Sequence, residues 1–236
     1  MVVTPSLSEA SSARSSSTAR RLTAACGLAF VTLFVLGTVL TTTGPLPNGP
    51  VEAEAARMAS EGDAIRVAGV FGLFTTLSFA GFALGLAMLA LDRHKPAAAA
   101  VTAGGGLIFG AVWTVSFAAV VTSAQAAQTG LSSDATMAMG HLHSVSLLLG
   151  FAPAGVVLLA SAAARTWGRS LTVAAVVIGV AALLASGSLL SADLDRGPLG
   201  AFVGASFLGI PLWVLAAALS LLWRRSKALG HVDVLA

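Results

Sequence analysis

Residues 67–91 read VAGVFGLFTTLSFAGFALGLAMLAL, a run without a single Asp, Glu, Lys or Arg. A helix of about 20 residues crosses the roughly 30 Å hydrocarbon core of a bilayer, so this run is long enough to span it. Charge-free stretches of comparable length recur on both sides, at 22–51, 96–133, 135–164, 170–192 and 197–223. We therefore predict an all-α polytopic membrane protein, a bundle of six transmembrane helices.

The composition supports this class and excludes others. The chain is 56% hydrophobic and 10% charged, whereas a soluble domain carries about 25% charged residues and needs them to cover its surface. The pI of about 10.0 does not indicate a nucleic-acid partner. The Lys and Arg residues occur in twos and threes between the apolar stretches and form no continuous basic surface of the kind that binds phosphates. The partner that we expect is the lipid bilayer.

The breaks between the stretches predict the domain organisation. Residues 1–20 are rich in Ser and Arg and are expected to form a disordered tail, followed by the transmembrane domain at 21–225 and a short tail at 226–236. A short surface helix is expected near 51–61, because Glu52 and Glu54 follow Pro50 and acidic residues suit a first helical turn. The six long helices are predicted near 22–43, 66–91, 97–123, 142–164, 170–191 and 198–223.

The basic residues also predict an orientation. Ten of the 13 Lys and Arg residues fall on one side of the six predicted spans, and only Arg57, Arg66 and Arg196 fall on the other. Cytoplasmic loops carry the excess of Lys and Arg. We therefore expect both termini in the cytoplasm and the surface helix outside. The ten are Arg14, Arg20, Arg21, Arg93, Lys95, Arg165, Arg169, Arg224, Arg225 and Lys227.

Small residues and prolines point to packing and to a binding site. The pairs Gly81/Gly85, Gly106/Gly110 and Gly200/Gly204 are each four residues apart, a spacing that lets membrane helices approach closely. We expect these faces to pack within the bundle, with a homo-oligomer as the alternative. Pro153 and Pro211 lie inside predicted helices, where a proline opens the local backbone. Candidate ligand-binding residues are Pro153, Trp113 and Trp213.

The predicted helices carry no Asp, Glu, Lys or Arg deep in their interiors. Ion-coupled transporters, proton pumps and voltage sensors work through such charges, so these classes are disfavoured. The intramembrane polar groups are hydroxyls, such as Thr75, Ser116 and Ser144, which bridge helices or bond to the backbone. No phosphate-binding loop, dinucleotide fingerprint or haem-ligand pair is apparent.

One cluster could hold a metal ion. The segment DATMAMGHLHS, residues 134–144, places Met137 four residues before His141 and Met139 four residues before His143. Thioether and imidazole groups suit copper, and imidazole with carboxylates from Asp134, Asp193 or Asp195 would suit zinc. Two His separated by one residue point about 200° apart on a regular helix. The alternative hypothesis is therefore that both histidines only pack at the helix end.

Two segments resemble a bacterial family of six-helix membrane proteins that is known only as a domain of unknown function. These are ARMASEGDAIRVAGVFGLFTTLSFAGFALGLAMLALDRHK (56–95) and GHLHSVSLLLGF (140–151). The resemblance extends over about residues 20–223. It implies a multi-pass protein of the bacterial inner membrane and supplies no catalytic residues.

Three functions remain as hypotheses. The first is a non-enzymatic membrane protein that binds a lipid or small apolar ligand or assists a membrane protein partner. The second is an enzyme or a copper- or zinc-binding protein with its site at the outer end of the fourth span. The third is a small-solute transporter. The first is favoured because the spans lack deep charges.

Overall fold

The computed structural model describes residues 7–40, 51–190 and 199–229, and these residues form helices and turns without any strand. Among them, α1, α3, α4, α5, α6 and α7 are long and apolar enough to span a membrane. The prediction of an all-α, six-helix membrane bundle is confirmed. The helices are α1 (Leu7–Leu40), α2 (Val51–Ser60), α3 (Gly62–Leu91), α4 (Pro96–Gln128), α5 (Ser133–Ala163), α6 (Arg169–Ser186), the 3-10 turn η1 (Gly187–Leu190) and α7 (Gly200–Leu229).

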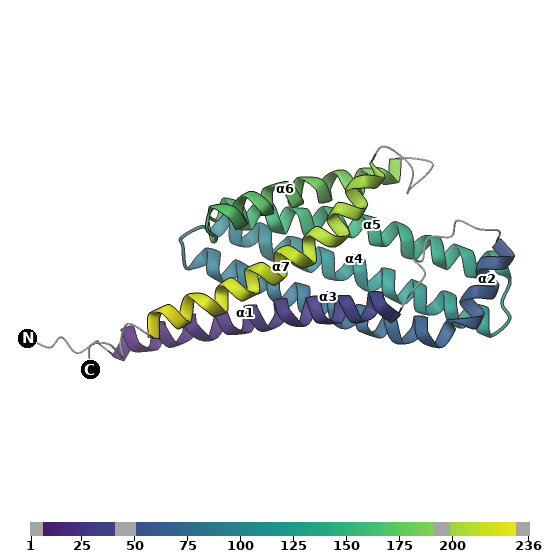
Figure 1. Cartoon of the computed structure of the whole chain (residues 1–236), viewed down its shortest axis with the longest axis horizontal. Helices are drawn as coiled ribbons and strands as arrows, with labels where there is room; N and C mark the ends of the chain where they lie inside the picture. Colours follow the sequence, from purple (N-terminus) through teal and green to yellow (C-terminus); the bar gives the residue numbers. More distant parts are fainter. Residues whose placement is uncertain (1–6, 41–50, 191–198, 230–236) are drawn as a thin grey trace, which may run out of the picture.

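The six long helices form a ring in chain order (Figure 1). Each long helix packs against the next, and α7 returns to pack against α1. The short helix α2 contacts α3, α4 and α5, and it lies across the end of the bundle that is remote from the start of α1 (Figure 1). We call this end the α2 end. Helices α3, α4 and α5 extend furthest toward it.

Apolar residues cover both the inside and the outside of the ring. Phe79, Phe82 and Phe109 are completely buried. On α3, however, Phe74 and Leu77 are more than half exposed. A soluble helix would carry polar residues on that outer face, whereas lipid accepts apolar ones. The exposed apolar surface is therefore the face that the bilayer covers.

Glycines allow close packing at several helix interfaces. Two of the three predicted glycine pairs, Gly81/Gly85 and Gly106/Gly110, lie at such interfaces. A methyl group added at Gly85 would overlap Thr23 of α1, and one at Gly106 would overlap Ala83 of α3. The third pair differs, because Gly204 is exposed and has open space around it. A close approach that the pattern did not single out joins α5 to α6. There a Cβ added at Gly155 would lie 2.6 Å from the carbonyl oxygen of Gly179.

Several helices are longer than predicted. Helix α1 begins at Leu7, so residues 7–20 are helical where the sequence predicts a disordered tail. Extending a helix that already exists avoids the cost of nucleation. Helix α5 begins at Ser133, well before the predicted 142, and Ser132 caps it by accepting a hydrogen bond from the backbone N–H of Ala135 at 3.3 Å. Polar residues thus continue these helices beyond their apolar spans.

The two internal prolines do not interrupt their helices. Pro153 lies within α5 and Pro211 within α7. The short helix occurs where it is predicted, at Val51–Ser60. Asp193, Asp195 and Arg196 lie outside the described residues.

Candidate functional site

A cavity of about 110 Å³ lies at the α2 end, between the ring of helices and α2. Its walls come from α1, α2, α3, α4, α5 and α7, and most of the lining atoms are apolar. The lining residues are Leu33, Phe34, Gly37, Thr38, Arg57, Met58, Ile65, Ala68, Gly69, Gly72, Thr75, Trp113, Phe117, Val120, His143, Leu147 and Phe207.

Helix α4 supplies an aromatic wall. Trp113, Phe117 and Val120 follow one another at helical spacing and therefore share one face. The rings of Trp113 and Phe117 meet edge-on with centroids 5.8 Å apart, and Phe117 lies 6.2 Å from the ring of His143. This stacking fixes the wall, because such aromatic pairs add stabilisation beyond their buried area.

Hydrogen bonds between α4 and α5 set the position of that wall. Ser123 Oγ donates to the carbonyl of Thr136 at 2.8 Å, Ser116 Oγ to the carbonyl of His143 at 2.8 Å, and Trp113 Nε1 to the carbonyl of Leu147 at 3.1 Å. The residue numbers of the acceptors on α5 increase as those of the donors on α4 decrease. The two helices are therefore antiparallel, and the three hydrogen bonds hold them in one register. Trp113 fits beside Gly150, where an added Cβ would overlap the indole.

His143 is the most polar side chain inside the ring. It is only 4% exposed and lines the cavity. Its Nδ1 lies 2.8 Å from both the carbonyl oxygen and Oγ of Ser116. All other polar side chains that are buried within the described residues belong to Ser or Thr. His143 is thus the one buried imidazole there, and in its neutral form it offers one donor and one acceptor nitrogen.

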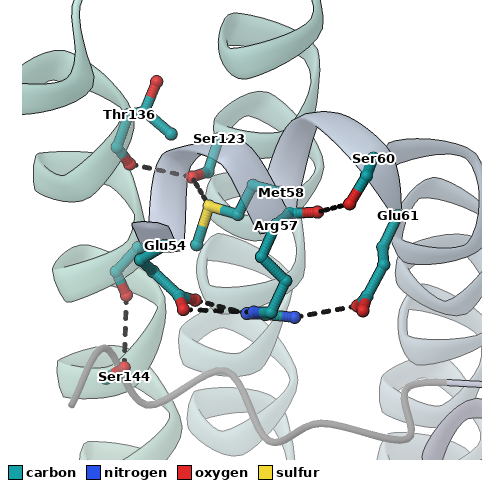
Figure 2. Close-up of polar contacts among 9 residues, drawn as sticks. Glu54, Arg57, Met58, Ser60, Glu61, Ser123, Thr136 and Ser144 are labelled. Carbon is teal, nitrogen blue, oxygen red and sulfur yellow. Dashed lines mark hydrogen bonds and ion pairs between the residues drawn. The ribbon is translucent and has the colours of Figure 1, made fainter. Parts of the chain in front are cut away.

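Helix α2 contributes Arg57 and Met58 to the lining of the cavity, and Figure 2 shows the contacts of both residues. Met58 is 1% exposed and points from α2 toward Ser123 of α4 and Thr136 of α5. Its sulfur lies 2.8 Å from Ser123 Oγ, and its methyl group faces Gly140. A hydroxyl has one proton to donate, and the carbonyl of Thr136 is a better acceptor than a thioether. Met58 is therefore held mainly by packing.

Arg57 forms the charged rim of the cavity. Its guanidinium binds both carboxylate oxygens of Glu54, with Nε 3.1 Å from Oε2, and its Nη1 lies 2.9 Å from Glu61 Oε2. Figure 2 shows Arg57 between the two carboxylates. The hydrogen bonds to Glu54 are the largest influence that raises the pKa of Arg57 above its ordinary value, against partial burial, which lowers it. Arg57 is therefore a cation that is already neutralised by acidic neighbours.

Of the three predicted ligand-binding residues, only one lines the cavity. Trp113 lines the cavity. Trp213 lies in the core instead, 2% exposed, where its Nε1 donates to the carbonyl of Leu171 at 3.0 Å. Pro153 packs against α4, and its carbonyl would lie 3.1 Å from a Cβ at Gly105. Trp213 and Pro153 are not among the residues around the cavity.

The residues predicted to bind metal point in different directions. Met137 and His143 are buried, Met139 is half-buried, and Asp134 and His141 are exposed. Within the described part of the chain, no three His, Cys, Asp or Glu side chains come together in a way that could hold a metal ion. Because Asp193 and Asp195 are outside that part, the copper or zinc site stays a prediction.

Sequence reasoning did not identify Arg57 or Met58 as site residues. Both lie in the short helix that Pro50, Glu52 and Glu54 predict, but the helices that it contacts cannot be inferred from those residues. Ser116 was noted only as one of many hydroxyls. Its partnership with His143 depends on the register between α4 and α5, which only the fold supplies.

Comparison with known proteins does not assign this chain to a family. No family model, curated protein or solved structure matches this chain.

Proposed function

We propose that this multi-pass membrane protein binds a small, neutral, mainly apolar molecule from the bilayer in the cavity at the α2 end. The observation that carries this proposal is the cavity itself, about 110 Å³ in volume and walled by six helices. An apolar cavity of about 150 Å³ holds a benzene molecule in a soluble protein. The volume suits one ring or a short alkyl segment of a longer chain.

The chemistry of the walls supports a neutral ligand. Aliphatic and aromatic side chains make up most of the lining, and Arg57 is bound by two carboxylates. An anionic group would have to displace Glu54 or Glu61 from the guanidinium, and a cation would meet no unneutralised acid among the described lining residues. Apolar pockets with one or two placed polar groups are typical of small-molecule sites.

We place this activity in a bacterial inner membrane, with both termini in the cytoplasm and the cavity near the outer surface. The distribution of the basic side chains supports the orientation. Arg20 and Arg93 line a small pocket at the end opposite α2, together with Thr166. Lys95 and Arg165 lie in the turns at that same end, and Arg169 begins α6 there. Only Arg57 and Arg66 belong to the α2 end among the described residues.

Filling the cavity tests the proposal. Ala68 lines the cavity and is buried, whereas Ala64, one turn earlier on α3, is exposed. Ala68→Leu should therefore occupy the space that the ligand needs, and Ala64→Leu serves as a matched control. The readout is quenching of Trp113 fluorescence by bromobenzene in lipid nanodiscs, since a bromine atom quenches an indole on contact.

Four tryptophans contribute to the signal, and Trp223 is 71% exposed to the surroundings. The Trp113 component is therefore obtained by difference from Trp113→Phe. We expect this component to be quenched in the wild type and in Ala64→Leu, and to lose most of its quenching in Ala68→Leu. Equal quenching in all three proteins would show that bromobenzene does not enter the cavity.

A further inference from the structure

The ring nitrogens of His143 have distinct environments. Nδ1 faces the backbone carbonyl of Ser116 at 2.8 Å. The hydroxyl of Ser116 has one proton, which it donates to the carbonyl of His143 at 2.8 Å. If Nδ1 carried no proton, its lone pair would face the lone pairs of the Ser116 carbonyl at hydrogen-bond distance. With a proton on Nδ1, both contacts become favourable, because Nδ1–H donates to the carbonyl and Ser116 Oγ–H donates back across the interface.

This arrangement fixes the tautomer. The hydrogen bond made by one ring nitrogen determines the state of the other. Hydrogen bonds of the His143 ring in the described structure involve only Ser116, so no carboxylate balances a charged imidazole there. A buried, unbalanced charge within a membrane span is costly. His143 is therefore neutral with its proton on Nδ1, and Nε2 keeps its lone pair as an acceptor.

The imidazole of His143 borders the cavity. Within the described residues the hydrogen bonds of the ring are made by Nδ1, and Nε2 has no partner there. The ring is 4% exposed and lines the cavity. The ring that borders this otherwise apolar space thus carries an unused acceptor. A buried acceptor without a donor is destabilising unless a ligand supplies one.

We infer that the cavity selects an apolar molecule with a single hydroxyl group, an alcohol or a phenol, whose O–H donates to Nε2 of His143. This inference rests on the proposed function and specifies its ligand class. A carbonyl or ether of the same shape would present only an acceptor to Nε2 and would be rejected. A carboxylate is excluded as well, since it is an acceptor and carries a charge.

Three probes of similar shape test the inference. 4-Fluorophenol carries a donor, 4-fluorotoluene replaces the hydroxyl by a methyl group, and 4-fluoroanisole has an acceptor alone. Their affinities for the protein in nanodiscs are measured by ¹⁹F NMR titration and corrected for partitioning into the lipid. We expect the phenol to bind about three- to tenfold more tightly than the toluene, the range that one net hydrogen bond supplies.

Substitutions at His143 separate recognition from structure. In His143→Asn the amide nitrogen occupies the place of Nδ1 and can still donate to the Ser116 carbonyl, while the amide oxygen lies near the place of Cδ2, so the position of Nε2 no longer holds an acceptor. We expect the phenol preference to disappear while the toluene affinity stays. Ser116→Ala keeps the backbone carbonyl that holds Nδ1–H, so it should retain the preference. A general loss of packing would instead weaken all three probes together.

The outcomes distinguish the two proposals. If the toluene and the phenol bind equally to the wild type, the hydroxyl inference is wrong and the apolar cavity remains. If none of the probes shows a bound resonance, the proposed function fails as well. Should His143→Asn not fold, ¹⁵N NMR of the histidine side chains in the wild type gives an independent answer. A buried imidazole protonated on Nε2 would overturn the inference.

Discussion

At Gly150, the absence of a side chain determines where the indole of Trp113 lies. An added Cβ at that position would overlap both Cδ1 and Nε1 of the indole. We expect Gly150→Ala to displace Trp113 from the carbonyl of Leu147 and to lower the free energy of unfolding by about 1–3 kcal/mol, as overpacking does. Denaturant titration in detergent measures this change.

Gly104 provides the control for that prediction. It lies in the same bundle, on α4, and a Cβ added there meets nothing within 4 Å. Gly104→Ala should therefore change stability by no more than about 1 kcal/mol, in the stabilising direction. Equal effects of the two substitutions would mean that Gly150 does not set the position of Trp113.

The residue scale is where the sequence is least informative. Trp113 could be placed in the bundle from its position within an apolar stretch, but Gly150 is one of 25 glycines. His143 was grouped with His141 because they are close in sequence, whereas one is buried and the other exposed. Helices that are apolar on every side have no polar face. Their periodicity cannot show which residues point inward.

Among the elements, α2 has the clearest separate role, since it lines the cavity through Arg57 and Met58 and is too short to span the membrane. Met58 is its fully buried side chain. We expect Met58→Ala to weaken the docking of α2 by about 2 kcal/mol, the lower end of the range for a buried methionine. Amide hydrogen exchange should then become faster in α2 while α3 to α5 keep their protection.

Met58→Leu is the matched variant, because it conserves volume and usually costs less than about 1.5 kcal/mol. It should leave exchange in α2 close to that of the wild type. Unchanged protection of α2 in Met58→Ala would indicate that this helix is held by other contacts, such as the Glu54–Arg57–Glu61 ion pairs.

The existence of α2 could be predicted, but its function could not. Pro50 followed by Glu52 and Glu54 marks a helix start, and the helix forms there. Its contacts are with Ser123 and Gly140, which are far along the chain. The ends of α4 and α5 were also misjudged, because uncharged polar residues extend both helices and the length needed to cross the bilayer does not fix where a helix ends.

For the molecule as a whole, charge spacing was sufficient to predict six spans, since roughly 20 apolar residues are needed for each crossing. The ring order, with α7 packed on α1, depends on side-chain fit and could not be predicted. The proposed orientation rests on the distribution of the basic residues and is directly testable. Cys26 is the only cysteine in the chain, so a Cys26→Ala background allows single labelling sites.

Ser60→Cys in α2 and Lys95→Cys in the turn between α3 and α4 place one thiol at each end of the bundle. With a membrane-impermeant maleimide on intact bacterial cells, we expect the first to be labelled at once. The second should be labelled only after the membrane is permeabilised. The reverse pattern would invert the orientation and place the cavity near the cytoplasmic surface.

The most direct measurement of ligand binding is the position of a bromine atom in crystals of the full chain soaked with 4-bromophenol. Anomalous scattering locates the bromine without reference to the protein phases. We expect a peak inside the cavity bounded by Trp113, Phe117 and His143, which is absent in Ala68→Leu and retained in Ala64→Leu. Bromine found only on the lipid-facing surface, with the cavity unoccupied at saturating probe, would contradict the proposal that this protein binds its ligand beneath α2.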